Sequence, residues 1–321
     1  MLAGTSPWPT TVIGEPATER ELTSLPDPTG DQRREETAPK RRGATAFMRS
    51  SARDSGRPTA RFDPHTAHAA RVCNFWLGGK DHFPADREVG EEVMRLRPQI
   101  VAGVRANRCF LGRVVRHFAA HGVRQFLDIG TGIPVPGSTH EIAQMADPRS
   151  RVVYVDNDAM VLAHARALLA SGPEGSCDYL EADLRDTGYL LREASRTLDF
   201  SQPVAVLLLA VLQLIPDDGN PGGLVTELVS ALAPASCIAI SHMTADFAPG
   251  PVAAATAAYN AAAAVPVTAR THAQVTALFG GLSLIAPGVV PITVWRPDIA
   301  DALPQPADLY GGVARTVARR W

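Results

Sequence analysis

The sequence of 321 residues lacks the features that mark several special classes of protein. No apolar run reaches the roughly 20 residues of a membrane-spanning helix. The formal net charge is only −2, so no strong overall field attracts nucleic acid or a membrane surface. Phosphate contact needs a basic surface, and the basic helix predicted over 100–121 is the one local exception. We therefore expect no membrane partner and disfavour a nucleic-acid partner.

Cysteine is also scarce. The chain has 4 cysteines, and no two of them form a C-x-x-C pair. This pattern indicates neither a disulfide framework nor a zinc site, and we expect reduced thiols in the core. The first residues lack a basic stretch followed by an apolar core, which is the pattern of a secretory signal. We therefore expect a cytoplasmic protein without a metal site.

A third absence concerns glycine. A short apolar run leads into a tight turn that contains Gly130 and Gly132. A dinucleotide-binding turn has the pattern G-x-G-x-x-G, but Val135 occupies the third glycine position. Pro134 and Pro136 also remove N–H donors from this loop. The loop therefore disfavours a pyrophosphate, and a nucleoside ligand without phosphates, such as S-adenosylmethionine, suits it better.

An acidic residue completes this pattern. The next predicted strand, 151–155, ends on Asp156. In a βαβ unit, an acid at the tip of the second strand lies beside the glycine turn of the first, where it can accept hydrogen bonds from both ribose hydroxyls. The alternative role for Asp156 is to cap the following helix, which Asn157 or Asp158 could do instead. The combined pattern indicates a nucleoside-binding fold.

The chain as a whole predicts three regions. Residues 1–60 are rich in Pro, Thr, Arg and Glu, and we expect a disordered N-terminal tail. Residues 61–122 contain predicted helices that would form a lid. Residues 123–321 alternate strands with helices, which predicts a doubly wound, mostly parallel α/β sheet. The last two apolar segments, 282–285 and 289–295, predict a C-terminal antiparallel hairpin.

Several short motifs carry a resemblance to a known family. They lie at residues 77–81, 105–108, 125–132, 153–158, 182–186, 215–218, 241–247, 295–297 and 310–313. With these motifs the chain resembles a bacterial S-adenosylmethionine-dependent methyltransferase family long catalogued as a domain of unknown function. That family is a branch of the class I, Rossmann-like methyltransferases. The resemblance implies a seven-stranded Rossmann-like sheet and S-adenosyl-L-methionine as cofactor.

The predicted cofactor-binding residues follow the strand ends and the flanking motifs. They are Lys80, Arg108, Asp128, Gly130, Thr131, Gly132, Asp156, Asn157, Asp183, Leu184 and Ala210. We expect Asp183 to accept the adenine amino group and the Leu184 backbone to contact the ring edge, and helix capping is the alternative for Asp183. Arg108 and Lys80 could pair with the methionine carboxylate, because arginine favours bidentate contact. Asp128 could fix the glycine turn or meet the cofactor's amino group.

The predicted catalytic residues are fewer. Methyl transfer displaces an already activated leaving group, so the protein mainly aligns the reactants and excludes water. A base helps only where the acceptor must lose a proton. The candidates are His242, Asp246 and Tyr259, and His242 comes first because it follows a strand that ends at the ligand crevice. Its alternative role is that of a hydrogen-bonded structural histidine. Gln213 stands where we expect histidine in relatives, which argues against a base there.

Three classes of function stay open at this point. The first is a methyltransferase that acts on an unidentified small molecule, with the N-terminal helices and the segment 243–268 covering the site. The second is an S-adenosylmethionine-binding sensor or scaffold without catalysis. The third is an NAD-dependent oxidoreductase, against which the two prolines and the missing glycine argue. The acceptor atom and the oligomeric state, a homo-oligomer included, cannot be read from the sequence.

Overall fold

The structure, a computed structural model, describes residues 63–168, 171–298 and 307–316. The predicted tail, residues 1–60, lies outside the described residues. All described residues belong to one unit, Gly56–Trp321. Within these ranges no helix has both the length and the apolar character needed to cross a membrane.

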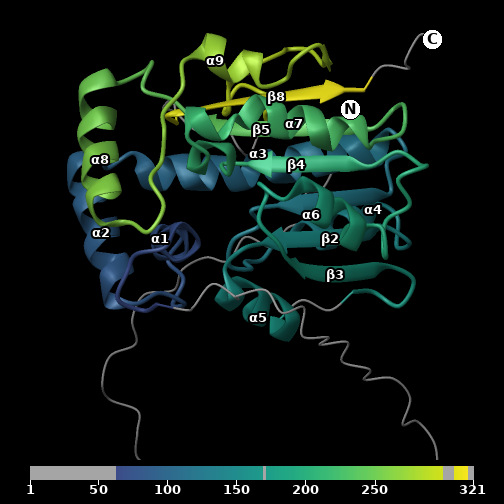
Figure 1. Cartoon of the computed structure of the whole chain (residues 1–321), viewed down its shortest axis with the longest axis horizontal. Helices are drawn as coiled ribbons and strands as arrows, with labels where there is room; N and C mark the ends of the chain where they lie inside the picture. Colours follow the sequence, from purple (N-terminus) through teal and green to yellow (C-terminus); the bar gives the residue numbers. More distant parts are fainter. Residues whose placement is uncertain (1–62, 169–170, 299–306, 317–321) are drawn as a thin grey trace, which may run out of the picture. The chain divides into compact units, whose positions relative to one another are not determined.

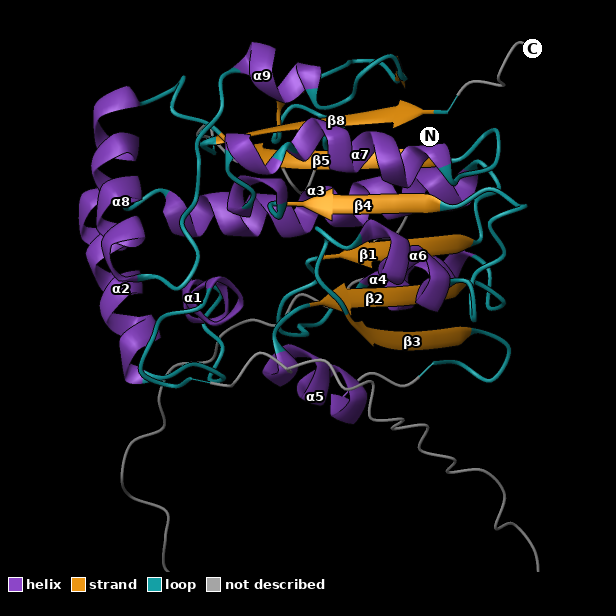
Figure 2. Ribbon diagram, viewed as in Figure 1, coloured by secondary structure: helices purple, strands orange, loops and turns teal. Residues whose placement is uncertain are grey.

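Apolar runs form the parallel part of the sheet (Figure 2). Its strands are β1 (Gln125–Ile129), β2 (Arg151–Asp156), β3 (Ser176–Glu181), β4 (Ala205–Leu209) and β5 (Cys237–Met243). Every residue of β1 and β4 is buried, as in a strand covered on both faces. The order β3-β2-β1-β4-β5-β8-β6 reverses direction between β1 and β4. In open α/β sheets, ligands bind at such a reversal, beyond the carboxyl ends of the strands.

The C-terminal part of the sheet is antiparallel, as predicted, but its pairing differs from the predicted hairpin. The strands are β6 (Ser283–Leu284), β7 (Val290–Pro291) and β8 (Leu309–Arg315). In the described part of the chain β6 and β7 each pair with β8 rather than with one another, and β8 also pairs with β5. The sheet therefore has eight strands rather than seven.

Two glycines explain why the sequence pattern does not predict β8 as a strand. Gly311 and Gly312 lie inside the strand, and glycine weakens the strand pattern. A Cβ on Gly311 would stand 3.0 Å from the Phe110 ring, and one on Gly312 would stand 2.8 Å from the Phe279 ring. The glycines are therefore needed because large side chains pack directly on the strand.

Helices cover both faces of the sheet (Figure 1). They are α3 (Ile100–Ala120), α4 (Thr139–Ala146), α5 (Ala159–Leu168), α6 (Thr187–Ala194), α7 (Pro221–Ser230) and α9 (His272–Ala277). Side chains of α3 and α4 join one hydrophobic core with β1 and β4, and side chains of α6, α7 and α9 join a second. A capping box of Ser138 and Glu141 begins α4, and one of Thr271 and Gln274 begins α9.

Three further helices form a separate hydrophobic cluster. They are α1 (Ala69–Trp76), α2 (Pro84–Leu96) and α8 (Pro249–Ala262). Helices α2 and α8 lie side by side, although they are far apart in the sequence (Figure 1). Their shared core includes Val72, Trp76, Val93 and Tyr259. The N-terminal helices thus pack against the long segment that follows β5.

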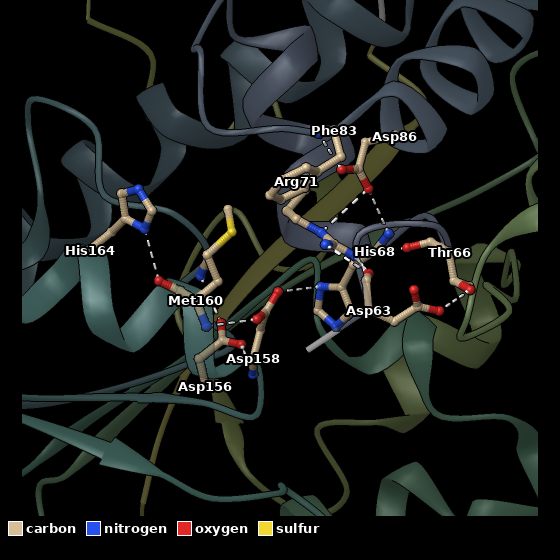
Figure 3. Close-up of polar contacts among 11 residues, drawn as sticks. Asp63, Thr66, His68, Arg71, Phe83, Asp86, Asp156, Asp158, Met160 and His164 are labelled. Carbon is tan, nitrogen blue, oxygen red and sulfur yellow. Dashed lines mark hydrogen bonds and ion pairs between the residues drawn. The ribbon is translucent and has the colours of Figure 1, made fainter. Parts of the chain in front are cut away.

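A buried ion pair organises this helical cluster (Figure 3). Asp86 is fully buried and lies 3.4 Å from the Arg71 Nε atom. Its two carboxylate oxygens accept the backbone N–H groups of His68, at 2.9 Å, and Phe83, at 2.8 Å. The Arg71 guanidinium also donates to two carbonyl groups of the preceding turn. One carboxylate thus fixes the start of α1 and the start of α2.

We expect the substitution Asp86→Ala to lower the free energy of unfolding by about 3–5 kcal/mol, because it leaves the buried Arg71 charge without its carboxylate partner. Urea denaturation of the variant and the wild type measures this loss. Glu92→Ala is the control, since Glu92 pairs with Arg95 on the exposed surface of the same helix. Equal losses in the two variants would contradict this account of the cluster.

Candidate functional site

A cavity of about 290 Å³ lies at the carboxyl ends of the parallel strands, where the strand order reverses. This volume is close to the lower end, roughly 300 Å³, of the range for small-molecule sites. The loops after β1, β2, β3 and β4 form one part of its wall, and helices α1, α3 and α8 contribute to the rest. Of the predicted cofactor-binding residues, all except Lys80 line this cavity.

The glycine turn after β1 belongs to the part of the cavity wall that the strand loops form. Gly130 and Gly132 have φ angles of +72° and +67°, which side chains rarely adopt. A Cβ on Gly130 would stand 2.5 Å from Val211, so the chain after β4 packs directly on this turn. A Cβ on Gly132 would meet nothing within 4 Å, so a ligand can approach its backbone closely. Ala210, at the end of β4, also has a positive φ and lines the cavity.

Asp156 holds the turn in place from the neighbouring strand. It is buried, and its Oδ2 atom accepts the Gly132 N–H at 2.9 Å while Oδ1 accepts the Asp158 N–H at 3.0 Å. Burial raises the pKa of Asp156, and the two N–H groups oppose that shift. Asp158, rather than Asp156, accepts the Met160 N–H at the start of α5. Because each carboxylate oxygen has two lone pairs, Asp156 retains acceptor capacity toward the cavity.

Two histidine contacts join the helical cluster to the strand loops. His68 Nδ1 lies 3.0 Å from Asp158 Oδ2 (Figure 3), and His68 itself lines the cavity. Burial acts to raise the pKa of Asp158, but contact with His68 keeps it below its ordinary value. His164 Nε2 of α5 lies 3.2 Å from Asp81 Oδ1. Sequence reasoning missed His68, because nothing local indicates which distant carboxylate it meets.

Asp128 and Arg108 face the same cavity from β1 and α3. Asp128 accepts a hydrogen bond from Thr139 Oγ1 at 2.6 Å. Burial raises the pKa of Asp128 to about 6, although the Thr139 hydroxyl and the Arg108 charge lower it. Burial also lowers the pKa of Arg108, and Asp128 opposes that shift. Arg108 donates to the Gly137 carbonyl group at 3.1 Å. Carboxylate and guanidinium therefore act on one another across this part of the cavity.

Asp183 and Leu184 line the cavity after β3, and Asn157 lines it after β2. Asp186 accepts the Tyr189 N–H and caps α6, so Asp183 does not have this role. Instead, the Asp183 carboxylate accepts a hydrogen bond from Arg185 Nη2 at 2.6 Å, and this contact lowers its pKa. A ligand amino group at Asp183 would therefore share the carboxylate with Arg185.

His242, the first of the predicted base candidates, is not among the residues that line the cavity. The side chain is fully buried at the end of β5. Its Nδ1 atom donates to the Met243 carbonyl group at 2.8 Å, and its Nε2 atom accepts from Arg270 Nη1 at 2.7 Å. Burial lowers the pKa of His242 to about 4, so the ring is neutral at pH 7. Both ring nitrogens are hydrogen-bonded, as expected for the alternative role of His242 as a structural histidine.

Arg270 explains why two of the sequence motifs occur together. This buried guanidinium donates to the carbonyl groups of Leu212, at 3.0 Å, and Ile215, at 2.8 Å. It also pairs with Asp217 at 2.7 Å and with His242. Arg270 thus connects the motif 215–218, in the loop after β4, with the motif 241–247 at the end of β5. Part of the loop after β4 lines the cavity.

The remaining predicted residues divide between the cavity and other places. Tyr259 of α8 is buried and lines the cavity. Asp246, also predicted as a base, does not line it. Its Oδ2 atom accepts the His272 N–H at 2.9 Å and the Tyr310 hydroxyl at 3.1 Å. Lys80 is exposed and is also absent from the lining, so the structure does not support its predicted contact with the cofactor.

The glycine turn, the acid that ends β2 and the strand order define a class I, Rossmann-like S-adenosylmethionine-binding fold. The sequence model of the S-adenosyl methyltransferases matches residues 55–317, and the chain belongs to this family. The protein is thus an S-adenosylmethionine-dependent methyltransferase, and S-adenosyl-L-methionine is its cofactor.

Two solved structures are similar over most of their length. A DUF574 family protein from Streptomyces avermitilis is 43% identical, with 79% of this chain and 98% of that chain covered and a TM-score of 0.76. A methyltransferase candidate from Thermobifida fusca is 35% identical, with 79% and 96% covered and a TM-score of 0.72. No curated protein sequence gives a significant match.

The pKa of Asp128 yields a prediction for stability. Its value of about 6 lies above the ordinary 3.8, so the folded protein binds this proton more tightly than the unfolded chain. The resulting stabilisation is present below about pH 4 and is lost as the pH rises through about 6. Relative to Asp128→Asn, the free energy of unfolding of the wild type should fall by up to about 3 kcal/mol between those limits. Urea denaturation at several pH values measures the difference.

The control for this experiment is Asp178→Asn, since Asp178 is exposed on β3. Its unfolding free energy should follow the wild type at every pH. If the Asp128→Asn curve also ran parallel to the wild type, the raised pKa of Asp128 would be refuted.

Proposed function

We propose that this methyltransferase acts on a small molecule that binds in the same cavity as the cofactor. The observation that carries the proposal is the composition of the cavity wall. The strand loops contribute the glycine turn and Asp156, whereas α1, α3 and α8 contribute mainly apolar side chains. One cavity thus offers polar contacts for a nucleoside and an apolar surface for a second molecule.

The residues around the strand ends fit S-adenosylmethionine. Asp156 has free acceptor capacity for ribose hydroxyls beside the Gly132 backbone, which is open to close approach. Leu184 offers an apolar wall, and Asp183 a carboxylate, for the adenine. Asp128 and Arg108 present opposite charges, which suit the ammonium and carboxylate groups of a methionine. We assign the adenosine to the first group of residues and the methionine to the second.

Held by these residues, S-adenosylmethionine would supply an activated methyl group to the acceptor. Residues of this chain therefore need to align the acceptor and exclude water. Of the three predicted base candidates, only Tyr259 lines the cavity. Burial raises its pKa, so its hydroxyl is neutral and can position an acceptor by hydrogen bonding. We assign Tyr259 this positioning role, and a proton released by the acceptor leaves the site for bulk solvent.

Calorimetric titration with S-adenosylmethionine, S-adenosylhomocysteine and NAD tests the cofactor site. We expect the first two ligands to bind and NAD not to bind, because Pro134, Pro136 and Val135 occupy positions that a pyrophosphate loop needs for N–H donors and glycine. Binding of NAD alone, or of none of the three ligands, would overturn the proposal.

Asp156→Ala should lower the affinity for S-adenosylhomocysteine by more than about 100-fold. Two hydrogen bonds to a charged group are lost, and each contributes roughly 1.5–3 kcal/mol. Circular dichroism should show a retained fold, and the affinity is measured by calorimetry. Asp218→Ala is the control, because Asp218 is exposed and does not line the cavity. An unchanged affinity in Asp156→Ala would contradict the placement of the ribose beside Asp156.

A further inference from the structure

The second part of the cavity wall is distinct from the proposed cofactor site. It comes from the end of α2, the first half of α3, one face of α8, the segment at 265–267 and the start of β8. Its apolar members include Val93, Ile100, Val104, Val252, Val267 and Leu309. Ile100 and Arg108 both line the cavity from α3, and they are separated by about 12 Å along the helix axis. The apolar part of the wall thus continues along α3 beyond the proposed methionine-binding residues.

The charges in this second part cancel. Arg97 and Asp308 form a bidentate ion pair, with N–O distances of 2.6 and 3.0 Å, and both side chains are largely buried. The other charged residues that line the cavity from described positions come from the strand loops or from Arg108 and His68. The wall around α8 and the start of α3 therefore offers no unpaired charge to neutralise an ionic ligand. Burying a charged ligand there would be unfavourable.

Two buried polar atoms in this wall lack a partner. Gln99 Oε1 and Thr256 Oγ1 make no hydrogen bond to any described residue, although both residues line the cavity. Buried polar atoms are normally hydrogen-bonded, so each unpaired one needs an explanation. Thr256 and Tyr259 are three residues apart on α8 and therefore share one face of the helix. A ligand in the cavity could complete this polar group.

From these features we infer the chemical class of the methyl acceptor. It is an uncharged, mainly apolar compound that carries a hydroxyl or N–H group. The Gln99 amide can accept or donate a hydrogen bond, and a hydroxyl or N–H group on the ligand suits it. The Thr256 hydroxyl can accept or donate. Carboxylated and phosphorylated compounds are disfavoured, because among the described residues of this second part the one cation, Arg97, is already paired with Asp308. The inference rests on the proposed function, since it places the acceptor next to the cofactor.

Two matched probes test this inference by calorimetry in the presence of saturating S-adenosylhomocysteine. They are 2-naphthol and 2-naphthoate, which share one ring system and differ in a hydroxyl or a carboxylate group. We expect 2-naphthol to bind at least about tenfold more tightly than 2-naphthoate. Equal affinity, preference for 2-naphthoate or no binding of either probe would overturn the inference. Failure of S-adenosylhomocysteine itself to bind would instead overturn the proposed function.

A pair of variants locates the polar contact. Thr256→Val keeps the shape of the side chain and removes its hydroxyl, and it should weaken 2-naphthol binding by about fivefold, the effect of one neutral hydrogen bond. Its affinity for S-adenosylhomocysteine should not change. Thr226→Val on α7 is the matched control, because the Thr226 hydroxyl bonds the Gly222 carbonyl group at 2.9 Å on an exposed face. Equal 2-naphthol affinity in the wild type and Thr256→Val would refute the contact.

Discussion

The carboxylate of Asp156 connects the parts of the molecule that must meet for a ligand to bind. Its two oxygens hold the glycine turn after β1 and the first residues after β2. Asp158, fixed by this contact, meets His68 at the start of α1. The start of α1 in turn depends on Asp86, which also begins α2. Asp156, Asp158 and Asp86 thus connect the strand loops to the helical cluster through hydrogen bonds and an ion pair. The two parts of the cavity wall are therefore held in position relative to one another.

A guanidinium has the corresponding role on the other side of the cavity. Arg270 gathers the loop after β4, the Asp217 carboxylate and the His242 ring around one buried positive charge. A histidine at the end of a strand has the sequence signature of a catalytic residue, yet here its neutral ring accepts a hydrogen bond from Arg270. His242, which the sequence suggests as a catalytic base, therefore helps to fix the loop that borders the cavity.

Local patterns were sufficient to predict most of the sheet, its antiparallel C-terminal part and the position of the glycine turn. They work for β1 and β2 because continuous apolar runs end in residues with special backbone or polar roles, Gly130 and Asp156. They fail where distant segments decide the outcome. The partner of His68 and the pairing of Arg97 with Asp308 depend on tertiary contact. β8 was hidden because its glycines serve the side chains packed on them.

The late position of β8 in the chain has a consequence for synthesis. This strand lies between β5 and β6, and it pairs with β5 over seven residue pairs. While a ribosome is still adding the residues before Leu309, the helices and strands that precede them can already fold, but β5 remains the edge of the sheet. An apolar edge strand is a template for pairing with other chains. The apolar edge of β5 therefore stays open to other chains until β8 pairs with it.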